Sequence, residues 1–429
     1  MKLIHALKGQ VLFILCFFMI IPMQLKIGGF ELKTTLITLF ALAITYMFSS
    51  IKSINKDILN VLAYLLFLAL YFCVNSLLYG LQDIEIVRRI LTIVVIFLAS
   101  LQLVRIYKNI YGELYSEKIL NHIVLVVLLH SIIMILIFMS EDMKLFIYNY
   151  VQVNELAEKH LENNLRMTGL FYSGFSSLGS LNGIIFIIVL AQVYEKKLTF
   201  PNSIVLTLIL LIQLIAIALS GRSGFIIVLF GLLYYIIISI KKSSKTAIMN
   251  LIKVITILAI FMVVLLLYLN SHSEYEKILH FAFEIIYNYM DTGSVSSKST
   301  TGLFTEMYFL PNSEIDTLVG TSNFGRSDSM PYIDSDSTYI LFIFGSGFIG
   351  LLIGFSIYFY FLYMTYKMKH VDDKIIFLLR FMIFTYFIIS IKDFYYFSFT
   401  GHGQIFFLLL SLLIFKNNKY KNMKVLKNV

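Results

Sequence analysis

Apolar runs recur along the whole of this 429-residue chain, and most of them are long enough to cross a lipid bilayer. A transmembrane helix needs about 20 mostly apolar residues, and its backbone groups must be hydrogen-bonded within the segment. The period-two alternation of a transmembrane barrel is absent from stretches such as 204–219. Charged residues make up only 14% of the chain, against about 25% in soluble domains. The sequence therefore predicts an all-α, polytopic integral membrane protein.

About twelve transmembrane helices are expected in a single membrane domain that covers 1–429. Their approximate ranges are 10–24, 34–50, 58–79, 87–104, 119–139, 172–194, 203–220, 223–240, 247–269, 338–362, 375–391 and 403–415. The first run follows a basic segment, as the apolar region of a signal peptide does. No small-residue cleavage site follows it, so we expect it to be retained as a helix.

The lysines and arginines indicate how these helices are oriented. They concentrate on the short segments that share a side with the N-terminus, and such segments are cytoplasmic by the positive-inside rule. Both termini are then cytoplasmic, and two long extracytoplasmic loops cover 140–168 and 271–337. The second loop lies between the ninth and tenth helices. Its apolar residues between 275 and 289 recur at helical spacing, which predicts an amphipathic helix on the membrane surface.

The net charge of +9 does not indicate a nucleic acid partner. Such a partner requires a basic face on a soluble domain, whereas these charges lie in short loops and in a lysine-rich tail that suits anionic lipid headgroups. Cys16 and Cys73 lie inside apolar runs and are expected to be buried thiols. No cluster of metal ligands is visible, so we expect neither a metal nor a cofactor.

Arg222 lies in a tight link, 219–224, between two apolar runs. The link is short, so the side chain must lie at the membrane boundary, where an ionisable residue is costly and often functional. A guanidinium flanked by serine and glycine backbone N–H groups suits a phosphate, which it can bind in a bidentate manner. The alternative is an arginine that reaches the lipid headgroups from a helix end. The residues alone leave both alternatives open.

Arg166 opens the segment 166–171, directly before the sixth apolar run. Taken alone it fits an interfacial anchor. Two extracytoplasmic arginines at the membrane face, Arg166 and Arg222, make a candidate site for a lipid-linked pyrophosphate.

The most polar stretch of the chain, 318–339, leads into the tenth predicted helix. Its carboxylates Asp328, Asp334 and Asp336 could ligate a cation, but the spacing lacks the glycine and the distal glutamate of an EF-hand. Asp336 could instead cap the helix together with Ser337, or it could orient or deprotonate a hydroxyl group.

Four features together give the chain a resemblance to a known family. They are the dozen helices with a large late loop, the Arg-x-x-Gly-Leu-Phe segment at 166–171, the small-residue–Arg turn at 220–224, and a glycine-rich segment 320–326 that leads through 334–340 into the paired glycines of 345–350. In these features the chain resembles the bacterial O-antigen (oligosaccharide repeat-unit) polymerases. The last feature is the most specific of the four.

The resemblance implies a membrane glycosyltransferase of the bacterial inner (plasma) membrane. Such an enzyme transfers a growing glycan from one polyprenyl pyrophosphate to the non-reducing end of another lipid-linked repeat unit, and so builds O-antigen or a related surface polysaccharide. Donor and acceptor are then its partners, and the leaving pyrophosphate needs preorganised positive charge. On this analogy Arg222 and Arg166 bind the pyrophosphate, Arg326 is a third contact, and Asp336 acts on the acceptor hydroxyl, with no metal required.

Two other functions remain as alternatives. The related O-antigen ligases typically carry a histidine where the large loop enters the next helix, and this chain has Asp336 there. A flippase for lipid-linked oligosaccharides would usually show paired halves and charges at the membrane midplane, whereas most charges here lie at helix ends. One departure from the polymerases is Tyr172, which stands where they often have a proline. The sugar, its linkage and any chain-length regulator are left open.

Overall fold

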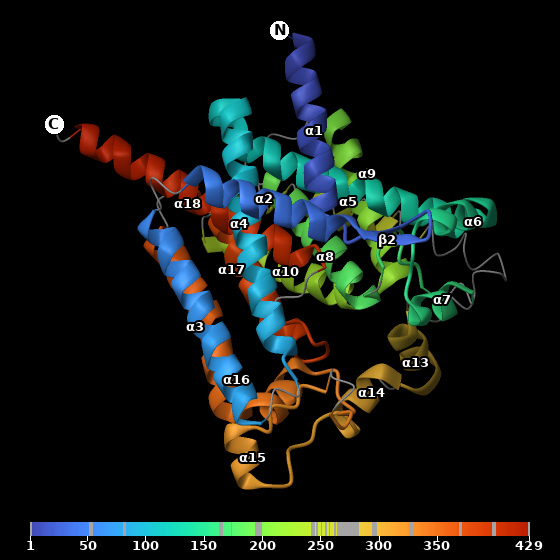
Figure 1. The fold of residues 1–429 in the computed structure, drawn as a ribbon. Helices are drawn as coiled ribbons and strands as arrows, with labels where there is room; N and C mark the ends of the chain where they lie inside the picture. Colours follow the sequence, from blue (N-terminus) through green and yellow to red (C-terminus); the bar gives the residue numbers. More distant parts are fainter. Residues whose placement is uncertain are drawn as a thin grey trace. The chain divides into compact units, whose positions relative to one another are not determined.

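The computed structural model describes residues 2–50, 55–79, 83–162, 166–172, 174–193, 200–241, 283–293, 298–325, 330–368, 371–396 and 400–427, with scattered residues between 245 and 263. Within these ranges the protein is predominantly helical, and its one sheet is a two-stranded hairpin (Figure 1).

Five described segments are long and apolar enough to span a membrane. They are Lys56–Leu78, Glu85–Met139, which runs through two helices, Phe175–Gln192, Ser223–Lys241 and Thr338–Lys367. Shorter apolar helices cover Leu7–Ile20, Thr34–Ser49 and Ile204–Ser220. These helices identify the chain as a helical, membrane-embedded protein, as the apolar runs predicted.

A helix lies in each predicted range except the ninth, 247–269, of which the structure describes only scattered residues. These helices are α1 (Lys2–Ile20), α2 (Thr34–Ser50), α3 (Lys56–Leu78), α4 (Glu85–Tyr111), α5 (Tyr115–Met139), α8 (Phe175–Val193), α9 (Phe200–Ser220), α10 (Ser223–Lys241), α16 (Thr338–Lys367), α17 (Asp373–Ile389) and α18 (His402–Lys427). The total of about twelve transmembrane helices stays a prediction.

The chain divides into two compact units. The first comprises 1–38, 107–295 and 400–402, and the second comprises 39–106, 296–399 and 403–429. Arg166 and Arg222 therefore belong to the first unit, and Asp336 belongs to the second. The single membrane domain over 1–429 stays a prediction.

Helix α8 is the centre of the first unit and packs against α5, α9 and α10. In its membrane-length window 83% of the residues are buried, against 39% in α10. Close approach to α10 depends on glycines, because a Cβ on Gly179 would lie 2.2 Å from the carbonyl oxygen of Gly221, and one on Gly224 would lie 2.3 Å from that of Gly179. Small residues at helix contacts allow backbones to approach in this way.

The segment predicted as the first long loop, 140–168, contains two helices, α6 (Glu141–Tyr150) and α7 (Glu155–Glu162). The side chain of Ser140 caps α6 and accepts a hydrogen bond from the Met143 amide at 3.3 Å. Asn154 Oδ1 accepts from the Ala157 amide at 2.9 Å and starts α7. Both helices are short and polar, so no transmembrane-length apolar run announced them.

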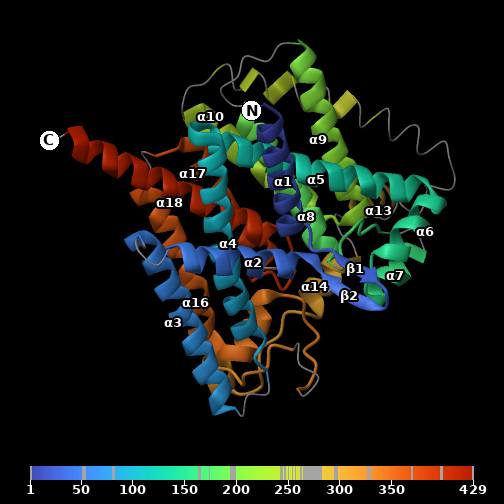
Figure 2. The same cartoon turned by 45° about the horizontal axis from the view of Figure 1, so that its top comes forward.

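An antiparallel hairpin follows α1, with β1 (Gln24–Ile27) and β2 (Phe30–Lys33) joined at Gly28 and Gly29 (Figure 2). Both glycines have positive φ, 56° and 86°, as a two-residue hairpin turn of the primed type requires. The Gln152 amide donates to the Gln24 carbonyl at 2.9 Å, which ties the hairpin to the segment between α6 and α7. The sequence analysis placed the end of a helix at residue 24, and that boundary was wrong because α1 ends at Ile20.

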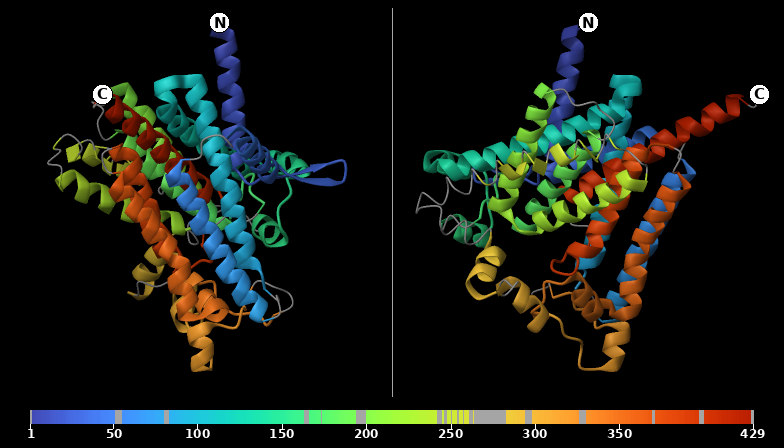
Figure 3. Two further views of the ribbon diagram at one scale, coloured as in Figure 1. Left: turned by 60° about the vertical axis from the view of Figure 1, so that its left-hand side comes forward. Right: turned by 180° about the vertical axis from the view of Figure 1, so that it is seen from behind.

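In the second unit α3 runs alongside α16 (Figure 3). The rings of Tyr64 and Tyr360 stack across this contact with centroids 5.1 Å apart. Helix α16 is interrupted at Gly347, which has φ of 66°, and α15 (Glu314–Val319) packs against the interruption. A Cβ on Gly347 would lie 2.1 Å from the carbonyl oxygen of Leu318, so this contact requires a glycine.

Of the large predicted loop 271–337, the structure describes α13 (Glu284–Thr292), α14 (Lys298–Thr305), residues 306–313, α15 and, between α15 and α16, residues 320–325 and 330–337. The described part of the predicted amphipathic helix is helical, and its apolar residues Ile286 and Tyr289 are exposed. The residues before 283 lie outside the description, so the full extent of that helix stays a prediction.

Candidate functional site

The turn that carries Arg222 joins α9 to α10 and is packed against the start of α8. Ser220 ends α9 with its hydroxyl donated to the Ala216 carbonyl at 2.7 Å. Gly221 follows, and a Cβ there would lie 2.8 Å from the carbonyl oxygen of Phe175, the first residue of α8. Only glycine allows this approach, so the local sequence fixes the backbone from which the Arg222 side chain extends.

Hydroxyl groups fasten the far side of the same turn to α8. Ser223 Oγ donates to the Ser176 carbonyl at 2.7 Å, and the hydroxyls of Ser176 and Ser180 lie 3.0 and 3.2 Å from Ser223 Oγ. Because Ser223 is buried, these bonds are shielded from solvent. The serines of the turn therefore hold the backbone on which Arg222 sits.

Arg166 reaches the same end of α8 through its own segment. The Met167 amide donates to the carbonyl of Leu219, near the end of α9, at 2.8 Å. The Arg166 guanidinium lies 5.6 Å from the centroid of the Phe175 ring, and the backbone of Phe175 touches Gly221. The structure thus brings together the two arginine-bearing segments that the sequence paired.

A buried histidine on α5 shapes the Arg166 segment. His130 Nε2 accepts a hydrogen bond from the Leu170 amide at 3.1 Å. Gly169 has φ of 59°, and a Cβ there would lie 2.7 Å from His130 Nε2. These two contacts explain why the fourth residue of Arg-x-x-Gly-Leu-Phe is glycine. The sequence analysis missed His130, which lies inside an apolar run with no local mark of its partner.

The segment is supported from α6 as well. Tyr148 Oη lies 3.5 Å from Thr168 Oγ1. Burial raises the pKa of Tyr148 to about 12, an effect that the Thr168 hydroxyl partly offsets. The phenol therefore stays protonated and uncharged beside the arginine segment at physiological pH.

His160 on α7 lies beside Arg166 and was also missed. Its ring meets the ring of Phe175 edge-on, with centroids 5.1 Å apart. Partial burial, and then the positive charge of Arg166, lower the pKa of His160 from its ordinary value of 6.5. The imidazole is therefore neutral at physiological pH and adds no charge to that of the arginine.

The guanidinium of Arg222 is occupied by a carboxylate of this chain. Arg222 Nη1 forms an ion pair with Glu284 Oε2, and the two side chains are 15% and 19% exposed. Alongside, the Phe283 ring lies 6.2 Å from that of Phe225. Sequence reasoning missed Glu284, because a pair separated by 62 residues leaves no periodic or spacing signal.

Asp336 belongs to the second unit, whereas Arg166 and Arg222 belong to the first. Its side chain is exposed, and it directly precedes Ser337, the N-cap residue of α16. Ser337 does not cap the helix as expected, because its side chain makes no capping bond and lies 3.2 Å from Tyr308 Oη and 3.3 Å from the Ser390 carbonyl oxygen instead. The capping role of Asp336 stays a prediction. Arg326 and Asp328 lie outside the described residues.

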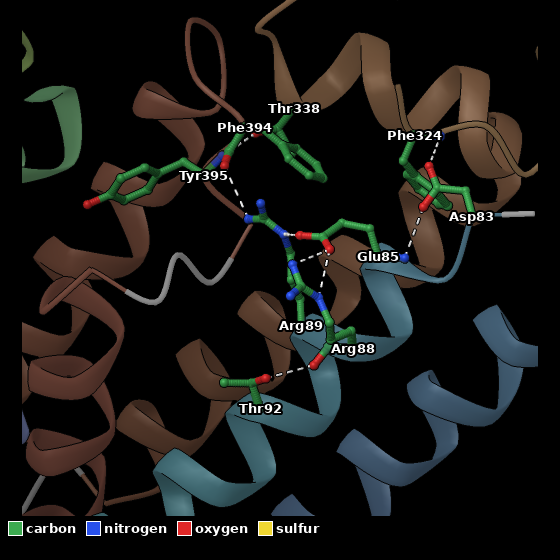
Figure 4. A network of polar contacts seen from close by, with 9 residues as sticks. All are labelled: Asp83, Glu85, Arg88, Arg89, Thr92, Phe324, Thr338, Phe394 and Tyr395. Carbon is green, nitrogen blue, oxygen red and sulfur yellow. Dashed lines mark hydrogen bonds and ion pairs between the residues drawn. The ribbon is translucent and has the colours of Figure 1, made fainter. Parts of the chain in front are cut away.

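A polar network in the second unit holds the glycine-rich segment and the start of α16 (Figure 4). Asp83 is buried and accepts hydrogen bonds from the amides of Phe324 and Glu85, both at 2.9 Å. Glu85 pairs with Arg88 and Arg89 on the first turns of α4. These acidic residues were not selected from the sequence, although an aspartate just before an apolar helix is a usual sign of a helix start.

The same network continues to the loop after α17. The Arg89 guanidinium lies 4.1 Å from the Phe394 ring centroid and donates to the Phe394 carbonyl at 3.4 Å (Figure 4). Thr338 Oγ1 donates to the Asp393 carbonyl at 2.5 Å and accepts from the Tyr395 amide at 2.8 Å. These bonds fix the first residue of α16, two positions after Asp336.

In chemical terms the first unit presents guanidinium groups and no metal-ligand cluster, since no group of three potential metal ligands gathers among the described residues. Guanidinium groups on a fixed backbone bind phosphate-type anions. No protein-family model, curated protein or solved structure matches this chain.

Proposed function

We propose that this protein is an extracytoplasmic glycosyltransferase that polymerises polyprenyl-pyrophosphate-linked oligosaccharide repeat units. The observation that carries the proposal is the meeting of the Arg166 and Arg222 segments at the start of α8, through the Met167–Leu219 hydrogen bond and the Phe175–Gly221 contact. Two arginines held at one helix end in a membrane protein suit a lipid-linked pyrophosphate better than a single interfacial anchor does.

At the anomeric carbon of the donor, the reaction forms one bond and breaks another. A hydroxyl oxygen of the acceptor sugar attacks the anomeric carbon of the donor glycan, and the bond from that carbon to the pyrophosphate oxygen breaks. The pyrophosphate leaves with the electron pair, and the hydroxyl proton passes to a base, the role proposed for the Asp336 carboxylate. Negative charge grows on the leaving group, and Arg222 and Arg166 stabilise it. Gly221 and the serines already fix the backbone from which the Arg222 side chain extends.

Asp336 is proposed to act on the hydroxyl group of the acceptor sugar. Its carboxylate is exposed and stands at the start of α16, where the Thr338 bonds and the hydrogen bond from Tyr339 Oη to the Phe387 carbonyl, 2.8 Å long, hold the backbone. A carboxylate can orient or deprotonate a hydroxyl group from such a position. Arg326 is proposed as a third contact to the pyrophosphate on the strength of the family resemblance alone.

The proposed placement follows the charge distribution. Both termini lie in the cytoplasm of a bacterial cell, about twelve helices cross the plasma membrane, and the segments with Arg166, Glu284 and Asp336 face outward. The product is O-antigen or a related surface polysaccharide of the cell envelope.

The surface-polysaccharide profile of a deletion strain tests this function. In the deletion strain we expect carriers that bear a single repeat unit. The wild-type gene should restore the ladder of chain lengths, and Arg222→Ala at an equal membrane level should not. Loss of all glycan from the outer face would instead indicate a flippase. Free polymer that is no longer joined to its final acceptor would indicate a ligase.

A further inference from the structure

We infer that Glu284 is a built-in competitor for the anion that Arg222 binds. In the absence of substrate its carboxylate holds the guanidinium, and a pyrophosphate takes the same position only by displacing it. The inference rests on the proposed function in one respect, which is that the displacing anion is the pyrophosphate of the lipid-linked donor.

The contact itself supports a competitor. Glu284 Oε2 accepts from Arg222 Nη1, and carboxylate and phosphate oxygens use the same planar donor fork of a guanidinium. A carboxylate on this arginine therefore marks the place where a phosphate oxygen would sit. Both side chains are largely covered, at 15% and 19% exposure, so the pair is not one of the solvent-screened surface pairs that contribute nothing measurable.

The position of Glu284 in the chain makes the contact reversible. Glu284 is the first residue of α13, which comes from the large segment between α10 and α16 rather than from the α8–α9–α10 core. The side chains Phe283 and Phe225 form a further contact beside the ion pair. Withdrawal of the start of α13 releases the carboxylate, while Gly221 and the serines keep the Arg222 backbone in place.

The difference in charge favours the pyrophosphate over Glu284 as the anion bound to Arg222. Glu284 carries one negative charge, whereas a pyrophosphate diester carries two and offers more acceptor oxygens. The Arg166 segment lies at the same end of α8 and can share the larger anion. The Arg222–Glu284 ion pair and the bound anion exclude each other. The free energy by which the ion pair weakens anion binding therefore equals the free energy by which the anion weakens the ion pair.

Titration of the full-length protein with inorganic pyrophosphate, in nanodiscs of zwitterionic lipid, tests the competitor. Glu284→Gln is expected to bind pyrophosphate about two- to fivefold more tightly than wild type, the factor by which an ion pair of moderate strength would hold back the anion. Arg222→Ala should bind it more weakly, and adding Glu284→Gln to Arg222→Ala should give no gain. Glu141→Gln is the matched control, because Glu141 pairs with Lys144 on α6, and its affinity should equal that of wild type.

Hydrogen exchange on the wild-type protein provides a second readout that does not depend on a variant's folding. Pyrophosphate should speed exchange of the α13 amides, residues 284–292, and this response should be absent from Arg222→Ala. Unchanged α13 exchange on binding would show that Glu284 is not displaced. Equal or weaker binding by Glu284→Gln would show that Glu284 orients Arg222 rather than competing for it.

The two proposals fail in different ways. If wild type binds pyrophosphate and Arg222→Ala does not, but Glu284→Gln behaves as wild type, the competitor is overturned and the pyrophosphate site stands. If wild type and Arg222→Ala show the same affinity, the anion does not use Arg222, and both proposals are overturned.

Discussion

At Gly169 the backbone of the Arg166 segment turns with φ of 59°, and a Cβ would meet His130 Nε2 at 2.7 Å. Gly28 in the hairpin turn has a similar φ of 56°, but a Cβ there would meet nothing within 4 Å. Alanine substitutions at these two glycines therefore distinguish the cost of a left-handed backbone, present at both, from the cost of crowding, present only at Gly169. A larger cost at Gly169 than at Gly28 therefore reports crowding against α5, chiefly against His130, with Met134 Cβ farther away at 3.3 Å.

Gly28→Ala is expected to lower the free energy of unfolding by about 1–2 kcal/mol, the cost of a left-handed non-glycine residue. Gly169→Ala should cost a further amount of about 1–3 kcal/mol, because the added methyl group overpacks against His130. Thermal unfolding in the same detergent measures both. Equal melting temperatures for the two variants would mean that His130 does not constrain the Arg166 segment.

The lowered pKa of His160 predicts how stability depends on pH. Above pH 6.5, the ordinary value of its pKa, the imidazole is neutral in both the folded and the unfolded chain and contributes nothing. As the pH falls below that value the unfolded chain takes up the proton first, because burial and Arg166 oppose the charged form in the folded protein. Acidification therefore favours the unfolded chain.

His160→Gln should remove part of the acid-induced loss of stability, measured as the melting temperature from about pH 7.5 to about pH 5.5, a range that brackets the ordinary histidine pKa. Glu158→Gln, an exposed neighbour on α7, is the control and should keep the wild-type dependence. A His160→Gln profile with the wild-type slope would contradict the placement of His160 beside Arg166.

At the scale of elements, the apolar helices could be predicted and the polar contacts could not. The range 34–50 coincides with α2, and 223–240 differs from α10 by one residue, because a long apolar run bounded by polar residues is a local signal. The hairpin and the polar helices α6 and α7 lack such a run. The hairpin turn depends instead on Gly28, and the starts of α6 and α7 depend on Ser140 and Asn154. The structure shows the roles of these single residues, which the sequence pattern did not.

The candidate site divides in the same way. Arg222 was found because it lies in a short link between two long apolar runs, and Arg166 because it directly precedes such a run. Glu284, His130 and Asp83 act on residues far away in the chain, and one sequence contains no signal for such pairs. Ser337 fails to cap α16 for a related reason, because its hydroxyl group bonds to the carbonyl of Ser390, at the end of α17, and to Tyr308 Oη.

At the scale of the whole molecule, the arginines and Asp336 belong to different compact units of one membrane-embedded chain. The proposed contacts to the leaving group, Arg166 and Arg222, both belong to the first unit. A substitution of either arginine therefore tests the proposed binding of the leaving group without any assumption about the other unit.

The most direct measurement is the rate of chain elongation by the purified protein in liposomes that contain polyprenyl-pyrophosphate-linked repeat units. The wild-type protein should produce a ladder of chain lengths, and Arg222→Lys should elongate about 10²–10³-fold more slowly, because lysine offers the leaving group a point charge in place of a planar fork. Arg105→Lys is the control, at a half-buried arginine on α4 that bonds Ser49 Oγ at 2.9 Å, and it should match wild type. Elongation by Arg222→Lys at the wild-type rate, or no elongation by wild type itself, would contradict the account.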